Sequence, residues 1–224
     1  AERVTEAWKV DIQLDGEQEV DVFERKDTTD IRSVSQDYDF DAGLIKTLGS
    51  NSGAGVSGTV FSRTFTNIQV GTRLRAAAEY NLFPYAISDQ KQVTFTYRIG
   101  PEYRTYREVT VFGKRRETLL QQSAEVNLRF NQTWGFVFAG VEWSNYFHDL
   151  SKNSVQFRSF LDVQLVEGLS LRLSFDAERI QDQLSLPAGD LSDEEVLLRR
   201  QERATSYEFG GSIGLSYTFG SIYN

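Results

Sequence analysis

Residues 207–219 alternate between apolar side chains and small or polar ones. The apolar positions are Tyr207, Phe209, Ile213, Leu215, Tyr217 and Phe219. A period of two indicates a β-strand whose two faces meet different surroundings. Aromatic residues near both ends of such a strand are typical of a transmembrane β-barrel, although the edge strand of a soluble sandwich can alternate as cleanly.

The same alternation recurs along the rest of the chain. It predicts further strands over residues 6–25, 31–48, 54–65, 70–83, 91–106, 117–131, 134–148, 154–166 and 169–183. Residues 54–65 are small on both faces, and residues 134–148 are apolar on both, so the pattern does not orient the second of these. We interpret residues 6–25 as one long strand, although Asp15-Gly16 could instead form a tight hairpin.

The connections between these strands fall into two sets. Short turns near 49–53, 84–90, 131–134 and 166–169 belong to one end, and connections near 26–30, 66–69, 107–116, 149–153 and 184–202 belong to the other. The second set contains the two longest, which matches the short periplasmic turns and longer extracellular loops of outer-membrane barrels. The sequence therefore predicts an all-β fold with a single domain over residues 1–224, a ten-stranded antiparallel up-and-down transmembrane β-barrel.

The longest connection contains a candidate helix. Ser192-Asp193-Glu194-Glu195 has the form of a capping box, which predicts a short helix over 193–201. The alternative is a solvated charged loop.

The polar faces of the predicted strands carry charges of both signs. This set comprises Asp37, Asp39, Asp41, Arg73, Arg75, Glu79, Arg98, Glu102, Glu125, Arg129, Arg158, Asp162, Arg172, Asp176, Glu178 and Glu208. In a soluble sandwich these charges would face water, whereas in a membrane barrel they face the lumen and need partners or water. About eight strands leave room only for side chains, so ten predict a plugged or very narrow lumen.

Aromatic residues cluster towards the predicted strand ends, where a lipid-facing girdle is expected. One rim would contain Trp8, Phe83, Tyr85, Trp134 and Phe219, and the other Tyr103, Trp143, Tyr146 and Phe157. Several predicted strands are also much longer than the commonest strand length in soluble proteins, which is about five or six residues. Both features favour lipid over a soluble core.

Composition narrows the function classes. The net charge is −8, with basic residues interspersed among acidic ones, so the chain lacks the basic face that nucleic-acid binding needs. The chain contains no cysteine, which excludes a disulfide framework and a zinc knuckle. It also contains no methionine, and we expect Ala1 to follow a processing site or a truncation.

Several motifs resemble a known family. They are Arg3–Lys9, Asn81-Leu82-Phe83-Pro84-Tyr85, His148–Lys152, Leu184–Gly189 and the closing Gly214–Asn224. In these stretches the chain resembles an uncharacterised family of Gram-negative outer-membrane β-barrel proteins. The resemblance implies a bacterial outer-membrane location, a lipid bilayer as partner, and a barrel at the C-terminal end of a longer precursor. Longer members of that family carry an additional soluble region before the barrel, so the expected partners include a soluble periplasmic domain or other envelope proteins. Many outer-membrane proteins end on an aromatic residue, so we expect a short tail to be missing after Asn224.

Candidate chemistry is sparse. His148 precedes Asp149 at a predicted strand end, a position that resembles the Asp/His site of the omptin proteases, but no second acidic pair matches theirs. The row Asp37, Asp39 and Asp41 spaces its carboxylates about 7 Å apart, too far for one cation, so pairing with arginines is expected. The glycine-rich residues 53–58 lack the lysine and helix of a phosphate loop.

The sequence thus predicts a non-enzymatic protein with no catalytic residue, cofactor or metal site. Its expected role is a structural anchor or assembly component of the outer membrane. The alternatives are a small selective, porin-like channel and an omptin-like hydrolase.

Overall fold

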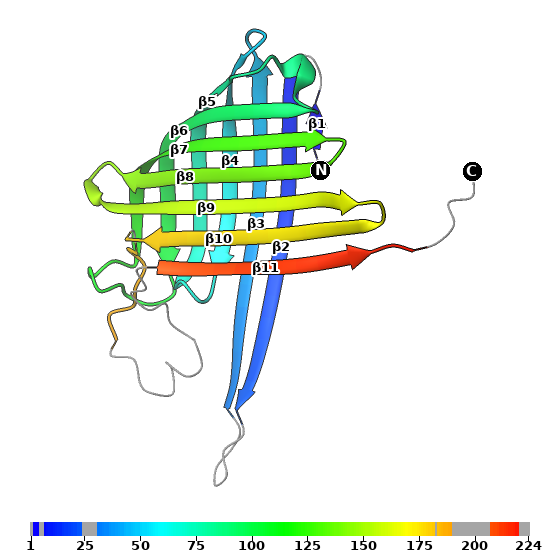
Figure 1. The fold of residues 1–224 in the computed structure, drawn as a ribbon. Helices are drawn as coiled ribbons and strands as arrows, with labels where there is room; N and C mark the ends of the chain where they lie inside the picture. Colours follow the sequence, from blue (N-terminus) through cyan, green and yellow to red (C-terminus); the bar gives the residue numbers. More distant parts are fainter. Residues whose placement is uncertain (1, 5–6, 24–30, 182, 190–206, 220–224) are drawn as a thin grey trace.

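The computed structural model describes residues 2–4, 7–23, 31–181, 183–189 and 207–219. These residues form one antiparallel sheet in which every strand pairs with the next along the chain (Figure 1). The strands are β1 (Glu2–Val4), β2 (Trp8–Phe23), β3 (Ile31–Thr47), β4 (Ser52–Arg63), β5 (Ile68–Asn81), β6 (Lys91–Tyr106), β7 (Arg116–Gln132), β8 (Gly135–Tyr146), β9 (Asp149–Val166), β10 (Leu169–Ile180) and β11 (Tyr207–Tyr217). A 3₁₀ helix, η1 (Tyr85–Ile87), lies between β5 and β6.

The ten strands β2–β11 confirm the predicted all-β, up-and-down order. β1, which pairs with Lys9–Asp11 at the edge of β2, was not predicted. β2 continues through Asp15 and Gly16, which lie opposite Asp39 and Tyr38 of β3, so the alternative hairpin is wrong. The predicted connection 149–153 instead forms the start of β9.

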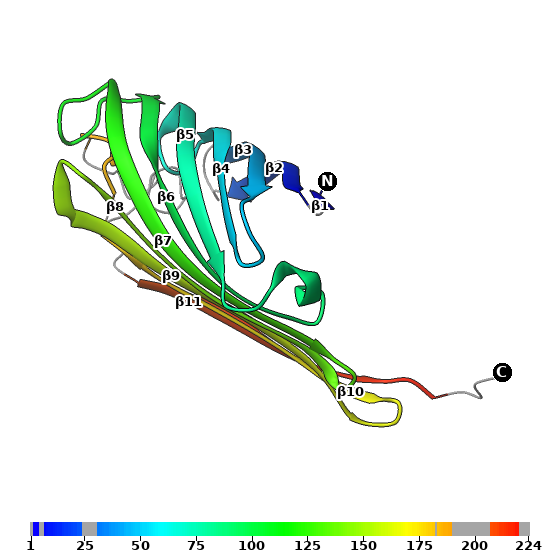
Figure 2. The same ribbon diagram turned by 90° about the horizontal axis from the view of Figure 1, so that it is seen from above.

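The described sheet is open. Within the described residues β11 pairs only with β10, and β2 pairs only with β1 and β3. Figure 2 shows that the sheet is strongly curved, with β2–β4 facing β9–β11 across its concave side. A cavity lined by residues of both walls, among them Arg63 and Glu208, lies in this hollow. β2 and β3 pair with each other beyond the end of β4, and in Figure 1 this hairpin projects from the sheet.

The register brings the polar faces of the strands together. Residues directly opposite each other in an antiparallel pair point to the same side. Glu125 on β7 lies opposite Thr96 on β6 and Glu142 on β8, and Ser144 lies opposite Ser123. This pairing orients β8, whose own sequence is apolar on both faces.

The concave face is polar and the convex face is apolar. On β6, Thr94, Thr96 and Glu102 are buried, whereas Phe95 and Tyr103 on the opposite face are exposed. The same inversion holds for the sheet as a whole, because buried polar residues outnumber buried hydrophobic ones among the described residues. Soluble domains place their apolar faces inside, so this sheet has the reverse polarity.

Two small apolar clusters lie at the end of the hollow where residues 64–67, 107–115 and 147–148 connect the strands. We call this end the loop end and the opposite end the turn end. One contains Phe61, Ile68 and Tyr106, and the other contains Leu119, Tyr146 and Leu184. Leu184 belongs to residues 183–189, which follow β10 and which we call the strap. The strap thus packs against β7 and β8 on the concave side.

The strap is also joined to the connection between β6 and β7. The Val111 amide donates to the Leu186 carbonyl, and the Ala188 amide donates to the Val109 carbonyl, both at 2.8 Å. Thr110 and Pro187 form an isolated β-bridge between these hydrogen bonds. The predicted helix over 193–201 lies outside the described residues.

Candidate polar site on the concave face

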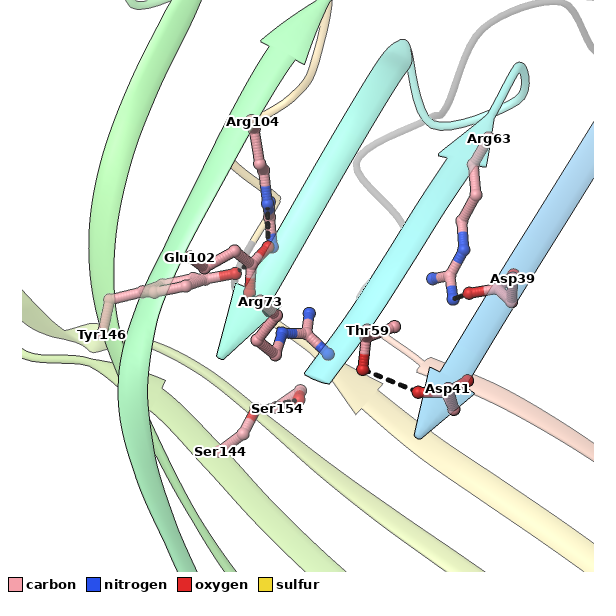
Figure 3. A network of polar contacts seen from close by, with 10 residues as sticks. All are labelled: Asp39, Asp41, Thr59, Arg63, Arg73, Glu102, Arg104, Ser144, Tyr146 and Ser154. Atoms are coloured by element: carbon pink, nitrogen blue, oxygen red, sulfur yellow. Dashed lines mark hydrogen bonds and ion pairs between the residues drawn. The ribbon is translucent and has the colours of Figure 1, made fainter. Parts of the chain in front are cut away.

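Glu102 on β6 is the centre of a buried ion-pair network (Figure 3). Its carboxylate accepts hydrogen bonds from Arg73 Nε at 2.6 Å and from Arg104 Nε, and its side chain is fully buried. Arg104 also donates to the hydroxyl of Tyr146 on β8. Removing Glu102 would leave Arg73 and Arg104 without their shared carboxylate, and breaking a buried ion pair in this way is strongly destabilising.

Further pairs line the same face. Arg98 donates to Glu125 at 2.5 Å, and Arg63 donates to Asp39 at 2.7 Å. Near the exposed end of β10, Arg172 pairs with Asp162 at 2.7 Å. Many of the charges expected to face a lumen therefore meet an opposite charge on a neighbouring strand.

The three aspartates of β3 have different partners. Asp39 pairs with Arg63, Asp41 accepts from the Thr59 hydroxyl at 2.6 Å, and Asp37 accepts from the Thr64 amide at 3.1 Å. Only Asp39 has the expected arginine partner among the described residues. The described part of the chain contains no group of three or more acidic, histidine or cysteine side chains placed to hold a metal ion.

Four other predicted charges lie on β9, β10 and β11. Arg158 and Asp176 are directly opposite each other on β9 and β10, as are Glu178 and Glu208 on β10 and β11. Arg129 is instead on β7, where it is exposed and lies opposite Phe138 of β8. The hollow thus has an excess of acidic groups on its β10–β11 wall.

Two predicted girdle residues lie elsewhere. Tyr146 was expected at a lipid-facing rim, but its side chain is 1% exposed and bonds Arg104 on the concave face. Glu142, Ser144 and Tyr146 are alternate residues of β8 and therefore share one face of the strand. The sequence did not reveal this face, because residues 134–148 are apolar on both sides.

Tyr85, the second displaced residue, belongs to η1. Its hydroxyl donates to Glu79 at 2.8 Å, and Lys9 Nζ lies 4.2 Å from its ring centroid. Glu79 also pairs with Lys9. Burial raises the pKa of the Tyr85 phenol well above its usual 10.0, and the hydrogen bond to Glu79 adds to this rise.

The other predicted girdle residues keep outward or edge positions. Trp8, Trp134, Trp143 and Phe219 are exposed, and Phe83 is half-buried beneath Lys91 Nζ at 4.6 Å. The exposed aromatic side chains therefore occur at both ends of the convex face.

Sequence reasoning missed Lys9, Arg63 and Arg104 as partners on the polar face. The strand alternation could have identified Arg104 as a partner of Glu102, because residues two apart on a strand lie on the same face. The alternation also places Lys9 on the polar face, but its partner Glu79 is on β5, which no local pattern shows. Arg63 is the last residue of β4, where the alternation alone does not show whether a side chain turns inward.

The cavities along the concave face include one at the loop end and one at the turn end. The loop-end cavity has a volume of about 390 Å³ and is lined by residues that include Arg73, Arg104, Tyr146 and Ser185. The turn-end cavity has a volume of about 470 Å³ and is lined by residues that include Lys9, Asp41, Arg98 and Glu125. Charged side chains from the ion-paired strands contribute to the lining of both cavities.

The candidate His148–Asp149 site is at the loop end. His148 is exposed, with its ring 5.8 Å from that of Tyr146. The Asp149 carboxylate accepts hydrogen bonds from the Ser151 amide at 3.0 Å and the Ser151 hydroxyl at 2.6 Å. These contacts give Asp149 a local structural role at the start of β9.

Within the described residues, no helix has the length and apolar character needed to cross a bilayer. No protein-family model matches the chain, and the searches of curated proteins and of solved structures likewise found no match. A function for the chain therefore has to be inferred from its polar concave face and its apolar convex face.

Proposed function

We propose that the chain is a transmembrane β-barrel of the bacterial outer membrane, non-enzymatic, and that it serves as a structural anchor or assembly component with a largely filled interior. In this arrangement the convex face contacts lipid and the concave face lines the lumen. β11 would close against the β1–β2 edge.

The observation that carries this proposal is the inverted polarity of the sheet. Burial of apolar surface is the main favourable term in folding in water, about 25 cal/mol per Å². A sheet that exposes Leu14, Leu74, Phe209 and Ile213 at 61–81% while burying Glu102 gains little of that term in water. A bilayer reverses the balance, because lipid covers the apolar face and the polar face retains its partners.

The interior contacts support a structural role. Ion pairs connect β2 with β5, β3 with β4, β5 with β6, and β6 with β7. The strap adds a second obstruction at the loop end, where Leu184 is buried against Leu119 and Tyr146. A filled interior of this kind suits an anchor better than a diffusion pore.

The test compares two neighbouring positions on β11. Ile213 is 77% exposed on the apolar face, whereas a side chain at Gly214 would enter open space on the polar face. A lysine at mid-membrane on the lipid face costs about 2–4 kcal/mol. Ile213→Lys should therefore reduce insertion into liposomes, measured by flotation after a high-salt wash, and Gly214→Lys should insert like the unaltered protein.

The outcome that contradicts membrane insertion is equally clear. If the unaltered chain is monodisperse without detergent, and both variants behave alike, the proposed function is wrong.

A second candidate function is a narrow, selective passage for small polar solutes. The observation that favours it is the pair of polar cavities that follow one another along the concave face. Planar-bilayer recordings separate the two functions. A filled anchor gives no steady openings, whereas steady openings of the unaltered protein would favour the passage.

A further inference from the structure

Arg75 on β5 and Glu142 on β8 mark the junction of the two cavities. They are the two residues that line both the loop-end cavity and the turn-end cavity. Their charges are opposite. A solute group at this junction would therefore meet a cation on one side and an anion on the other.

Arg75 differs from the neighbouring arginines of the concave face. Arg73 pairs with Glu102 and Arg98 pairs with Glu125, but Arg75 forms no ion pair among the described residues. Its Nε atom is buried and has no hydrogen-bond partner within the described part of the chain. A buried donor without a partner costs about 1–3 kcal/mol, more when charged, so an acceptor supplied by a ligand would be favourable.

Gly100 on β6, one of the two strands between Arg75 and Glu142, leaves space beside Arg75. β6 and β7 separate β5 from β8, which places the strand axes about 14 Å apart along the sheet, from a spacing of about 4.8 Å per strand. Gly100 on β6 approaches Arg75, and a Cβ built on Gly100 would lie 1.9 Å from the Leu74 carbonyl oxygen. The backbone therefore keeps this position free of a side chain.

Gln121 supplies a complementary atom. It lies opposite Gly100 on β7 and lines the loop-end cavity. Its Oε1 atom is buried and accepts no hydrogen bond from any described residue. The site thus offers an unused cationic donor at Arg75 and an unused acceptor at Gln121, with Glu142 as the anionic group.

We propose that this junction, consisting of Arg75, Gln121 and Glu142, binds a small zwitterion of the amino-acid class. The carboxylate of the ligand pairs with Arg75, and its ammonium group donates to Glu142 and Gln121. A simple anion would leave Glu142 and Gln121 without a donor, and a simple cation would leave Arg75 without an acceptor. The volume of about 390 Å³ on the loop side is within the range of small-molecule sites.

The site is independent of the proposed membrane function in one respect. Arg75, Gln121 and Glu142 all belong to the continuous stretch of sheet from β5 to β8, so the site does not need β11 to close against β2. Binding can therefore be measured in detergent micelles, and its failure is distinct from a failure of insertion.

The experiment titrates the refolded full chain with a series of linear ω-amino acids of increasing chain length, by calorimetry. Acetate and methylammonium, which carry one charge each, are the comparison ligands. We expect one chain length in the series to bind best and at least tenfold more tightly than either comparison ligand, a margin of about 1.4 kcal/mol. Equal binding of acetate and the amino acids would overturn the proposal, as would no binding of any member.

Substitutions then locate the site. Arg75→Gln and Glu142→Gln should each weaken binding of the best ligand by about tenfold or more. Arg172→Gln and Glu167→Gln are the matched controls, because neither residue lines the two cavities, and they should bind as the unaltered protein does. Retained affinity in both junction variants would overturn the assignment. If either variant fails to refold, the comparison ligands on the unaltered chain still decide the proposal.

Discussion

At the residue scale, the main feature of this protein is that charged side chains are buried and large apolar side chains are exposed. Glu102 is fully buried between two arginines, whereas Phe209 is 81% exposed. Burying a charge is costly unless it is paired and hydrogen-bonded. The arginines that surround Glu102 therefore determine where this carboxylate can lie.

Replacing Glu102 should be strongly destabilising. Glu102→Gln leaves Arg73 and Arg104 without their shared carboxylate, and breaking a buried pair costs about 3–5 kcal/mol. Asp162→Asn is the matched control, because Arg172, its partner, is 65% exposed and such a pair contributes about 0–1 kcal/mol. Urea unfolding in detergent micelles, followed by tryptophan fluorescence, measures both. Equal effects would contradict the central role of Glu102.

Tyr85 should make stability depend on alkaline pH. Its pKa in the folded protein is raised above the usual 10.0 by burial and by the hydrogen bond to Glu79. The unfolded chain therefore loses this proton at a lower pH than the folded one, so the stabilisation is complete below about pH 10 and is lost as the pH rises towards the folded pKa.

Tyr85→Phe tests this dependence. At neutral pH the variant should be less stable by about 1 kcal/mol, because the hydrogen bond to Glu79 is lost. The difference from the unaltered protein should shrink above about pH 10. Urea unfolding over that pH range measures it, and a constant difference would contradict the assignment.

At the element scale, the strap depends on Asn67 for its position. The side-chain Nδ2 of Asn67 donates to the Ser185 carbonyl at 2.8 Å and to the Glu108 carbonyl at 3.2 Å. The side-chain Oδ1 of Asn67 accepts from the Glu108 backbone amide at 2.8 Å. Its φ of 60° lies in the left-handed region, which asparagine tolerates better than most residues. One residue thus connects the β4–β5 turn with two other loops.

Asn67→Ala should release the strap without unfolding the sheet. The substitution removes all three side-chain hydrogen bonds and adds backbone strain, at a local cost of about 1–3 kcal/mol. Limited proteolysis should cut the variant faster within 183–189. Asn67→Gly is the companion variant, because it loses the same hydrogen bonds without the backbone strain. Its cleavage rate should lie between those of the unaltered protein and Asn67→Ala. Unchanged cleavage in both would show that Asn67 does not hold the strap.

The sequence was largely sufficient to predict which segments form strands, but it did not predict for every strand which face is concave. The period-two pattern predicted β2–β11 in order, because alternation is a local property of each strand. β8 could not be oriented, because both of its faces are apolar. Which of its faces is concave became clear only from the pairing, in which Glu142 and Ser144 lie opposite Glu125 and Ser123 of β7.

At the scale of the whole molecule, the proposed barrel requires a contact between β11 and β2. β11 carries glycine and serine on its polar face, and β2 extends beyond the short β1 that covers part of its edge. The two strands would be antiparallel, as every pair in the sheet is. Closure also removes the exposed strand edges of the open sheet.

Cysteine pairs can test this closure, because the chain contains no cysteine of its own. Gly214→Cys would be combined in turn with Gln13→Cys, Asp15→Cys or Glu17→Cys, all on the polar face. In liposomes, one combination should form an intramolecular disulfide, which needs Cα atoms about 4.4–6.8 Å apart. Gel mobility with and without reductant detects it, and the single-cysteine variants are the controls. No cross-link in any combination would contradict closure at these registers.

The sequence by itself determined the strands, their order and the unlike character of their two faces, because side-chain alternation follows directly from strand geometry. The tertiary structure decided which charges meet. Glu102 meets Arg73 because the register of β5 and β6 places them opposite each other, and Tyr146 of β8 reaches Arg104 of β6 across the concave face of the curved sheet. Arg75 and Glu142 meet the same two cavities from strands that are not neighbours. Such relations depend on register and curvature, which no local pattern specifies, and the concave polar site therefore exists only in the folded sheet.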